Sequence, residues 1–546
     1  MTPMTQTPPV RSETPPAHEP LSGPGNEDRN ASGNNARTRQ TEVFAVHGAD
    51  PEVLAYAMAK YSRSALSMKE SLREISSQRA EQFLNTFYFQ YGHRSIADLA
   101  HVAFAIEKLS LLAAIVLVDE QRWDGQERST RYQNFRKSGW YEPDFGGDGS
   151  AASRYQETIE HLFSRYHDIF EAVFASLTQQ VRKPEEMKQE AYERTLRARA
   201  FDVARYLLPL ATNTSLGQIV NARTLESQIS RLLSSPTAEI RQLGERLQAA
   251  AAGAAWNVHG DELAALQREI TALDPALGER AAALLTREVK TSPTLVKYAS
   301  ANEYLMRTRQ DLRQAAAELL ASEPIEATPL VDLIDGADSL EVDLATTLLY
   351  GQCHYPYRQI RRHVAALSEA RRNEIIALGV RHRGRHDELL REFSAGQALR
   401  FDILMDIGGF RDMHRHRRCV QVLQSFTSAH GYAIPEGVAE AGVQPLYEET
   451  MQSAHAAYVA LAGASQPDAA ASAQYVLPLG TRNRALFKMD FAEALYISEL
   501  RSAPQGHFSY RRVAWEMYRA VERQHPSLAP YFRVTDADEP VDLLRR

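Results

Sequence analysis

Two segments of this chain combine residue types that suit the binding of a phosphate-bearing ligand. One is Arg415-His416-Arg417, which is followed after seven residues by Ser425. The other is Ser129-Thr130-Arg131-Tyr132, which is preceded at the same spacing by Asp119-Glu120-Gln121. Successive cations repel one another unless anions lie between them, and arginine binds phosphate oxygens through two parallel hydrogen bonds. A serine hydroxyl, backbone N–H groups in a turn and an arginine can also hold phosphate. Both segments therefore predict anion binding.

The two segments are copies of one pattern, because further landmarks recur around them in the same order. The paired landmarks are the helical segments 51–62 and 341–351, the strand-like segments Phe104–Ile106 and Phe401–Ile403, the Leu-Pro-Leu segments Leu208–Leu210 and Leu477–Leu479, and the basic helices that contain Arg241 and Arg512. One shared tripeptide would mean little. Landmarks in the same order at similar spacing indicate a duplication.

The pattern Arg-His-Arg-x7-Ser resembles the signature of the flavin-dependent thymidylate synthases, and the chain resembles a tandem, partly degenerate member of that family. The resemblance implies that the triplet binds FAD, together with a Gly-His-Arg-Ser-x-x-Asp segment and an Asn-Ala-Arg segment. The positions that match the family's flavin-binding residues are Arg415, His416 and Arg417, Ser95 and Asp98, and Asn221 and Arg223.

The resemblance also implies a nucleotide substrate, dUMP. The positions that match the residues that bind it are Ser129, Arg131, Tyr132 and Arg205. Arg501 matches the arginine that polarises the uracil ring and so makes its C5 atom nucleophilic; such electrostatic help contributes a few kcal/mol. The implied reaction reduces FAD with NADPH, takes one carbon from methylenetetrahydrofolate and converts dUMP to dTMP.

The two copies have lost complementary parts of this pattern. The first copy has Asp119-Glu120-Gln121 where the second has its cationic triplet, and the second has Gln474 where the first has Arg205. Family sites lie between protomers of a homotetramer, so the resemblance implies a homodimer of fused chains that forms a pseudo-tetramer. We predict that the triplet lines one cleft with Ser129, Arg131, Asn221 and Arg223, within one chain or across the dimer.

The hydrophobic pattern predicts an α+β fold rich in helix. Residues 159–177 place apolar side chains at three- and four-residue steps, as one long amphipathic helix does. Strand-like runs are fewer: Val102–Ile106, Phe401–Leu404 and the segments before the two serine motifs. We therefore predict two tandem units similar to the family's, each a small antiparallel sheet flanked by long helices.

Composition predicts how the chain divides. Residues 1–40 are rich in Pro, Ser, Gly, Asn and charge, which predicts a disordered tail. We expect the first unit at 41–264, a helical connector at 265–330 and the second unit at 331–546.

Composition also excludes several classes of protein. The 546 residues carry a net charge of -7, which argues against a nucleic-acid partner. Cys353 and Cys419 are far apart, which excludes a disulfide scaffold and a thiolate zinc site, and we expect no metal. The sequence has no long apolar run and no secretory signal, so we expect no membrane partner and a cytoplasmic location.

Two other functions remain open at this stage. A degenerate paralogue would bind flavin or nucleotide but would have an altered substrate or no turnover, because each copy lacks part of the pattern. A non-enzymatic protein would use the basic segment at 414–418 to bind RNA or phosphate, with an affinity that falls as salt rises.

Overall fold

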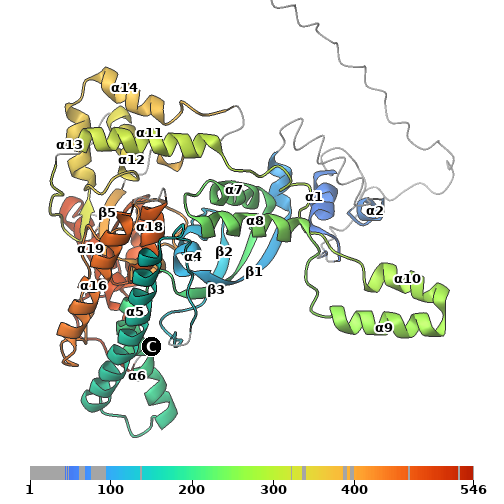
Figure 1. Cartoon of the computed structure of the whole chain (residues 1–546), viewed down its shortest axis with the longest axis horizontal. Coiled ribbons are helices and arrows are strands. Elements are labelled where there is room, and N and C mark those ends of the chain that lie inside the picture. Colours follow the sequence, from blue (N-terminus) through green and yellow to red (C-terminus); the bar gives the residue numbers. More distant parts are fainter. Residues whose placement is uncertain are drawn as a thin grey trace, which may run out of the picture. The chain divides into compact units, whose positions relative to one another are not determined.

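The computed structural model describes residues 44, 46, 48–60, 68–74, 94–135, 138–320, 323–334, 340–384, 390–393, 399–464, 468–526 and 529–544. The predicted tail at 1–40 lies outside these residues. The helices and strands all belong to Ala49–Arg546, which forms one unit (Figure 1).

The first half of the chain builds one sheet with helices around it. In chain order its elements are α1 (Pro51–Lys60), α2 (Met68–Glu74), the 3-10 helix η2 (Arg94–Leu99), β1 (His101–Ser110), α4 (Leu111–Leu117), β2 (Asp124–Glu127), α5 (Gly149–Gln180), α6 (Gln189–Ala204), η3 (Arg205–Leu207), β3 (Asn213–Asn221), α7 (Ala222–Leu233) and α8 (Ala238–Ala252).

The second half repeats this order after three helices. Those helices are α9 (Gly260–Leu273), α10 (Pro275–Leu285) and α11 (Glu303–Leu320). The second half then contains β4 (Val331–Leu333), α12 (Leu340–Tyr350), α13 (Tyr357–Ala366), α14 (Glu369–Leu378), η4 (Arg391–Phe393), β5 (Leu399–Asp406), α15 (Ile407–Met413), β6 (Val420–Leu423), α16 (Gln444–Ala462), α17 (Ala469–Ala473), η5 (Gln474–Val476), β7 (Arg482–Met489), α18 (Phe491–Ser502), α19 (Phe508–Gln524) and η6 (Ala529–Tyr531).

The two sheets have equivalent topologies. The first has the antiparallel order β1-β3-β2, and the second has β4-β5-β7-β6, so β5, β7 and β6 repeat β1, β3 and β2. Ser129 and Ser425 each come two residues after the end of the equivalent strands β2 and β6. The predicted α+β fold with two small antiparallel sheets is confirmed, and the alignment of the two serine motifs agrees with the strand register.

A β-bulge accounts for a one-residue difference between the copies. The pairing of β1 with β3 shifts between Glu107 and Leu109, and Lys108 between them has a positive φ of 60°. The pairing of β5 with β7 runs without such a shift. Lys108 is thus the extra residue that lengthens the distance in sequence from Phe104 to Ser129.

The two halves meet through their Leu-Pro-Leu segments. The N–H of Leu210 donates to the carbonyl of Leu477 at 3.0 Å. The equivalent N–H, of Leu479, donates to the carbonyl of Leu208 at 2.9 Å. Exchanging the halves converts one bond into the other, which is the property of a local twofold axis.

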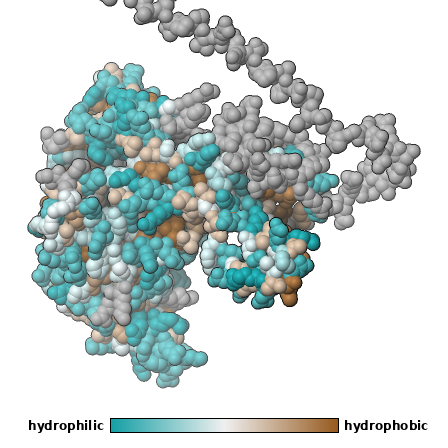
Figure 2. Space-filling model, turned by 45° about the vertical axis from the view of Figure 1, so that its right-hand side comes forward, coloured by the Kyte–Doolittle hydropathy of each residue, from teal (hydrophilic) through white to brown (hydrophobic). Residues whose placement is uncertain are grey.

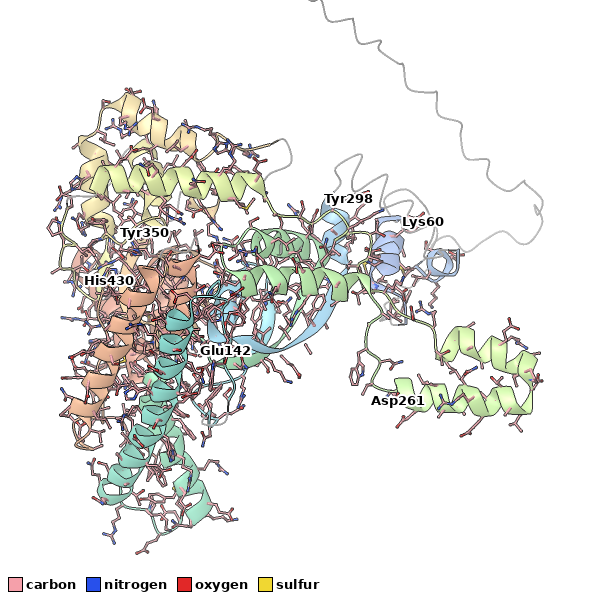
Figure 3. The ribbon with its side chains drawn as sticks, viewed as in Figure 1. Lys60, Glu142, Asp261, Tyr298, Tyr350 and His430 are labelled. Carbon is pink, nitrogen blue, oxygen red and sulfur yellow. The ribbon has the colours of Figure 1, made fainter. Side chains whose placement is uncertain are left out.

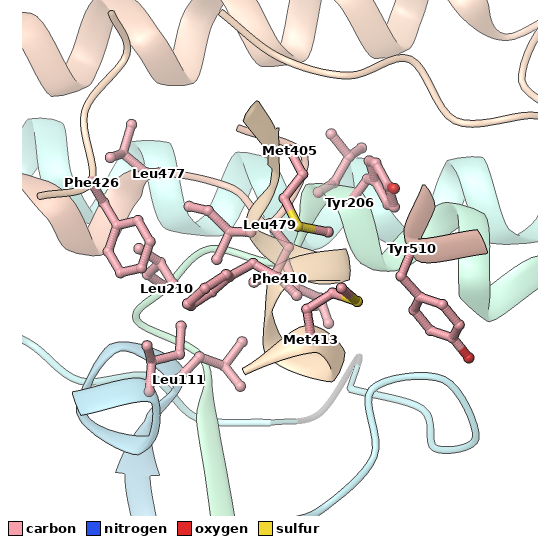
Figure 4. Close-up of a cluster of buried hydrophobic side chains, with 14 of the residues drawn as sticks. Leu111, Tyr206, Leu210, Met405, Phe410, Met413, Phe426, Leu477, Leu479 and Tyr510 are labelled. Carbon is pink, nitrogen blue, oxygen red and sulfur yellow. The ribbon is translucent and has the colours of Figure 1, made fainter. Parts of the chain in front are cut away.

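The largest apolar core contains side chains from both halves. Figure 4 shows part of it, where Leu111 and Leu210 of the first half pack with Phe410 and Leu477 of the second. The predicted stripe of α5 is buried at Ile159, Leu162, Phe163, Tyr166, Ile169, Phe170 and Val173. Helix α5 lies beside α6 and α16 (Figure 1), so this stripe joins helices of both halves.

Helices α12 and α13 cover the second sheet on the side away from that core. Tyr350 and Ile360 pack in one apolar cluster with Val420, Val422 and Leu486 of the strands. Seven of the eight residues of β7 are buried in consequence. Both faces of this sheet are therefore covered, although β7 also buries the charged side chains of Arg484 and Lys488.

Helices α9 and α10 form an antiparallel hairpin that projects from the sheets (Figures 1 and 3, near Asp261). No residue of α9 is buried, and Gly278 is the one buried residue of α10. A backbone bridge between Ala254 and Lys290 holds the base of this excursion. In the view of Figure 2 the surface is mostly hydrophilic, with apolar residues in small patches.

We expect Glu239→Ala to destabilise the protein by roughly 2–4 kcal/mol, because it leaves buried donors without an acceptor. Glu239, at the start of α8, accepts hydrogen bonds from the N–H and hydroxyl of Ser110 and from the hydroxyl of Tyr475 of the other half. Urea unfolding measures the change. Glu245→Ala on the exposed side of α8 is the control, and an equal effect of both substitutions would contradict this account.

Candidate functional site

The arginine of the first serine motif is held by groups from both halves. Arg131 is 8% exposed, and its Nε and Nη2 atoms donate to the two carboxylate oxygens of Asp202 at 2.7 and 3.2 Å. Asp202 lies in the last turn of α6. The Nη1 atom of Arg131 donates to the hydroxyl of Tyr510 in α19 at 3.0 Å. A two-pronged ion pair and a hydrogen bond therefore fix the guanidinium.

The same tyrosine contacts the candidate catalytic arginine. The guanidinium of Arg501, at the end of α18, lies over the Tyr510 ring at 5.4 Å from its centroid. The Nε atom of Arg501 donates to Nε2 of His416 at 2.8 Å, and Nδ1 of His416 lies 3.6 Å from a carboxylate oxygen of Glu493. Burial lowers the pKa of His416. A histidine that accepts at Nε2 is neutral, so its proton is on Nδ1, toward Glu493.

These contacts form a continuous series from Asp202 through Arg131, Tyr510, Arg501 and His416. We call this set the kept cluster. Its motif residues belong to motifs that one half of the chain retains and the other half has lost. Arg131 belongs to the first half, whereas His416 and Arg501 belong to the second. The structure thus brings together part of what the complementary losses predict.

Arg205 adds a second buried guanidinium beside the serine motif. Its side chain is 2% exposed, and Nη1 donates to the hydroxyl of Thr130 at 3.2 Å. Arg411 of α15 donates to the same hydroxyl at 3.3 Å. The nearest carboxylate to Arg205 is that of Asp412, at 3.9 Å from Nη2. The Nε and Nη2 atoms of Arg205 are buried without a hydrogen-bond partner, which is an arrangement that an anion would relieve.

The remaining residues of the serine motif are more accessible. The Oγ atom of Ser129 accepts a hydrogen bond from the N–H of Arg131 at 3.2 Å, as in a turn. Tyr132 is 58% exposed, and its ring lies 5.7 Å from the Arg131 guanidinium. Both residues are therefore on the open side of the buried arginine.

The cationic triplet faces its acidic counterpart. The segments Asp119–Gln121 and His416–Arg417 line one small cavity of about 20 Å³. Arg417 donates to the carbonyl of Val118 at 2.5 Å, and its guanidinium lies over the Trp123 ring at 4.8 Å. Burial lowers the pKa of Arg417. Arg415 is exposed. The two copies of the triplet therefore meet near the local twofold axis.

The acidic triplet is neutralised by arginines. Asp119 accepts from Arg391 at 2.6 Å, and Glu120 accepts from Arg231 at 2.7 Å. Burial alone would raise the pKa of Asp119, but Arg391, His414 and Arg231 hold it well below its usual range. Protein carboxylates thus compensate these arginines where a ligand anion would otherwise be required.

The other predicted flavin residues lie apart from the kept cluster. Asn221 caps α7, where its Oδ1 accepts from the N–H of Thr224. Arg223 pairs with Asp98 at 3.4 Å. Ser95 lies in η2, and its side chain is outside the described part of the chain, as is the whole of residues 91–93. Within one chain the described contacts do not join this group to His416.

A large cleft of about 1210 Å³ lies between the halves at a different place. Its walls contain Asp119–Arg122 of the first half and Gln421–Phe426 of the second, with Gln474, the counterpart of Arg205. Arg223 also lines it, whereas Arg131, Arg205 and Arg501 are not among its lining residues. The degenerate motifs of the two halves therefore share this cleft with Arg223, whereas Arg131, His416 and Arg501 share the kept cluster.

Sequence reasoning missed the partners that hold the retained residues. Asp202, Arg411, Glu493 and Tyr510 were not predicted as site residues. One signal was available for Asp202: an aspartate among apolar neighbours, in Ala-Phe-Asp-Val-Ala, three residues before Arg205. A charge in such a stretch needs a partner when the helix is buried.

Comparisons with known proteins show the family to which the two halves belong. The family described as "Thymidylate synthase complementing protein" matches the chain in two segments, residues 44–254 and 346–527, one in each half. These segments define a duplicated protein of the thymidylate synthase-complementing class. The chain belongs to this family.

Individual relatives differ in how much of the chain they match. A UPF0159 protein from Chlamydia muridarum is 28% identical over 535 residues, which covers 91% of this chain and 92% of that protein. A flavin-dependent thymidylate synthase from Clostridium tetani is 28% identical over 177 residues, 32% of this chain and 67% of its own. A crystal structure of thymidylate synthase X from Helicobacter pylori with FAD and dUMP has 15% identity, a TM-score of 0.25, and coverage of 36% of this chain and 88% of that one.

The described helices include none that combines the length and the apolar character needed to cross a bilayer.

We expect the stabilising effect of Asp202 to disappear in acid. Burial would raise its pKa, but Arg131 and then His507 lower it to about 2. A carboxyl whose pKa is depressed on folding stabilises the protein above its unfolded pKa, and this contribution is lost as pH falls through the folded pKa.

The free energy of unfolding should therefore be higher in the wild type than in Asp202→Asn by about 2 kcal/mol at pH 6. This difference should shrink between pH 4 and pH 2. Urea unfolding across this range measures it. Asp168→Asn is the control, because Asp168 forms an exposed pair with Arg165. A difference between wild type and Asp202→Asn that stays constant down to pH 2 would contradict the assignment.

Proposed function

We propose that this protein is a flavin-dependent thymidylate synthase-like enzyme that methylates dUMP to dTMP, with FAD as cofactor and NADPH and methylenetetrahydrofolate as co-substrates. Family membership supports the class of chemistry. The observation that carries the proposal is the series of contacts Arg131–Tyr510–Arg501–His416. In this series, the residue of one half that matches the family's nucleotide-binding motif contacts residues of the other half that match its catalytic and flavin-binding motifs.

The nucleotide phosphate fits the arginines beside the first serine motif. Arg205 has two buried donor atoms without acceptors, and Ser129 and Arg131 lie next to it in the turn after β2. A phosphate dianion would accept hydrogen bonds from such donors and balance their charge. Tyr132 on the open side is placed to contact the sugar.

Arg501 suits a role in polarising the uracil ring. Its Nε atom is occupied by His416, and among the described residues its two Nη atoms make no hydrogen bond. Neutral His416 cannot repel the guanidinium, so Arg501 retains two donors for a ring carbonyl. Negative charge that develops on the ring would be stabilised by these donors by a few kcal/mol.

The flavin fits the triplet, and its supply of hydride removes the need for a cysteine nucleophile. Arg415 is exposed and makes no hydrogen bond or ion pair within the described part of the chain, so it is available to a pyrophosphate. Arg417 is held by Val118 and Trp123 beside it. Asn221 and Arg223 would contact the same flavin only from a second chain, which is a reason to propose a homodimer.

A second candidate function is a degenerate paralogue that binds ligand without thymidylate synthesis. The ion pair of Arg131 with Asp202 favours it, because a phosphate must compete for the guanidinium. Release of tritium from dUMP labelled at C5, measured with FAD, NADPH and methylenetetrahydrofolate, distinguishes the two functions. Release supports the enzyme, and a flavin spectrum without release supports the paralogue.

The two ligands should depend on different arginines. We expect Arg417→Met to weaken FAD binding and Arg131→Met to weaken dUMP binding, each by about 1.5–3 kcal/mol, or roughly ten- to hundredfold. Flavin absorbance and calorimetry measure the two affinities. Arg418→Met is the matched control, because this neighbour of Arg417 is exposed and pairs with Asp490 at the surface. If neither substitution changes either affinity, the split site is refuted.

The active species should be a homodimer related by a twofold axis. Light scattering should give twice the chain mass at micromolar concentration, because Arg223 and His416 do not meet within one chain. A monomer that still binds FAD would show that the flavin does not need residues of both chains.

A further inference from the structure

The large cleft is not a second copy of the kept cluster. At three positions in this cleft, one half has a different residue type from its counterpart in the other half. Asp119 and Glu120 stand where the second half has residues of its cationic triplet, and Gln474 stands where the first half has Arg205. A ligand bound here must therefore use other residues. The cleft has a volume of about 1210 Å³, which is ample for a ligand of nucleotide size.

Helix α11 supplies such residues. Arg309 and Arg313 lie four residues apart, hence on one face of the helix, and both line the cleft. Among the elements of the first half that the structure describes, none corresponds to α11. The placement of these arginines does not follow from either copy of the motif.

Both arginines lack a direct partner among the described residues. Within the described part of the chain, neither Arg309 nor Arg313 makes a hydrogen bond or an ion pair. The neighbouring arginines differ in this respect, because Arg231 pairs with Glu120 and Arg391 pairs with Asp119. Arg122 and Arg223, which also line the cleft, both pair with Asp98, so Arg309 and Arg313 are the cleft arginines without a direct partner among the described residues.

Of these two arginines, Arg309 is the one whose charged form is destabilised by burial. Burial lowers the pKa of Arg309, and the charges of Arg231 and Arg391 lower it further, although Glu392 opposes them. Arg313 is exposed at the rim. A cation that is partly desolvated and lies among other cations is stabilised when an anion binds.

We propose that Arg309 and Arg313 form a second anion site, in the large cleft, for a phosphate-bearing ligand. Guanidinium groups bind phosphate through paired N–H donors, and two of them on one helical face can contact one phosphate or two linked phosphates. Tyr298, labelled in Figure 3, also lines the cleft and is 58% exposed, so an aromatic base could stack on it. This site does not depend on the proposed thymidylate synthesis.

Calorimetry with inorganic pyrophosphate and the full-length protein tests this site. The wild type should bind pyrophosphate, and Arg309→Met should weaken that binding at least tenfold, whereas Arg309→Lys should weaken it less. Arg307→Met is the matched control, because Arg307 is an exposed arginine of the same helix that pairs with Glu303. Arg131→Met reports separately on the kept cluster.

Other outcomes would overturn the proposal. Pyrophosphate binding that survives in Arg309→Met, or that is lost in Arg131→Met instead, would place the anion elsewhere. Citrate binding as tight as pyrophosphate would show that the site does not select phosphate. Thermal unfolding provides a second measurement: pyrophosphate should raise the Tm of the wild type but not that of Arg309→Met. The variant alone should unfold no earlier than the wild type, because it loses an uncompensated charge.

Discussion

The reciprocal backbone pairing of the two Leu-Pro-Leu segments constrains the rest of the structure. Leu208–Leu210 and Leu477–Leu479 hydrogen-bond each other about a local twofold axis, and the main core forms around them. A segment that lies near such an axis is next to the equivalent segment of the other half. Two cationic triplets would then face each other, and their repulsion in a partly buried place would be severe. In this chain His416 and Arg417 line a small cavity with Asp119–Gln121 instead, and the negative charges of Asp119 and Glu120 partly offset the burial of Arg417.

A second pair of contacts shows how the halves could diverge without losing their packing. In the first half the hydroxyl of Ser110 donates to the carboxylate of Glu239. In the second half the same two elements are joined by Ser509 and Asp406, where the hydroxyl is on the helix and the carboxylate is at the end of the strand. The donor and acceptor have exchanged places, but one serine hydroxyl still donates to one buried carboxylate. Selection on such an interaction preserves the pairing rather than the residue at either position.

The sequence predicts those parts of the molecule that depend on local pattern or internal repetition. The stripe of α5 and the alignment of Ser129 with Ser425 agree with the structure, because helical period and motif spacing are properties of neighbouring residues. The central strands β3 and β7 were not predicted. The sequence of β3 contains polar residues and a glycine, and that of β7 begins with three basic or amide residues before its apolar ones. The role of α11 was missed because only the tertiary fold brings it to the cleft.

Buried guanidinium groups of the kept cluster and of the large cleft are compensated in different ways. Arg131 has Asp202, and Arg231 and Arg391 have Glu120 and Asp119, so these guanidinium groups are stable with or without a ligand. Donors that lack such partners point more clearly to a ligand. Removing them from water costs free energy, and this cost is offset when an anion binds. Such donors occur on Arg205 in the kept cluster. A chain built from two copies of one unit therefore gathers different arginines at these two places, and the two anion sites that we propose rest on that difference.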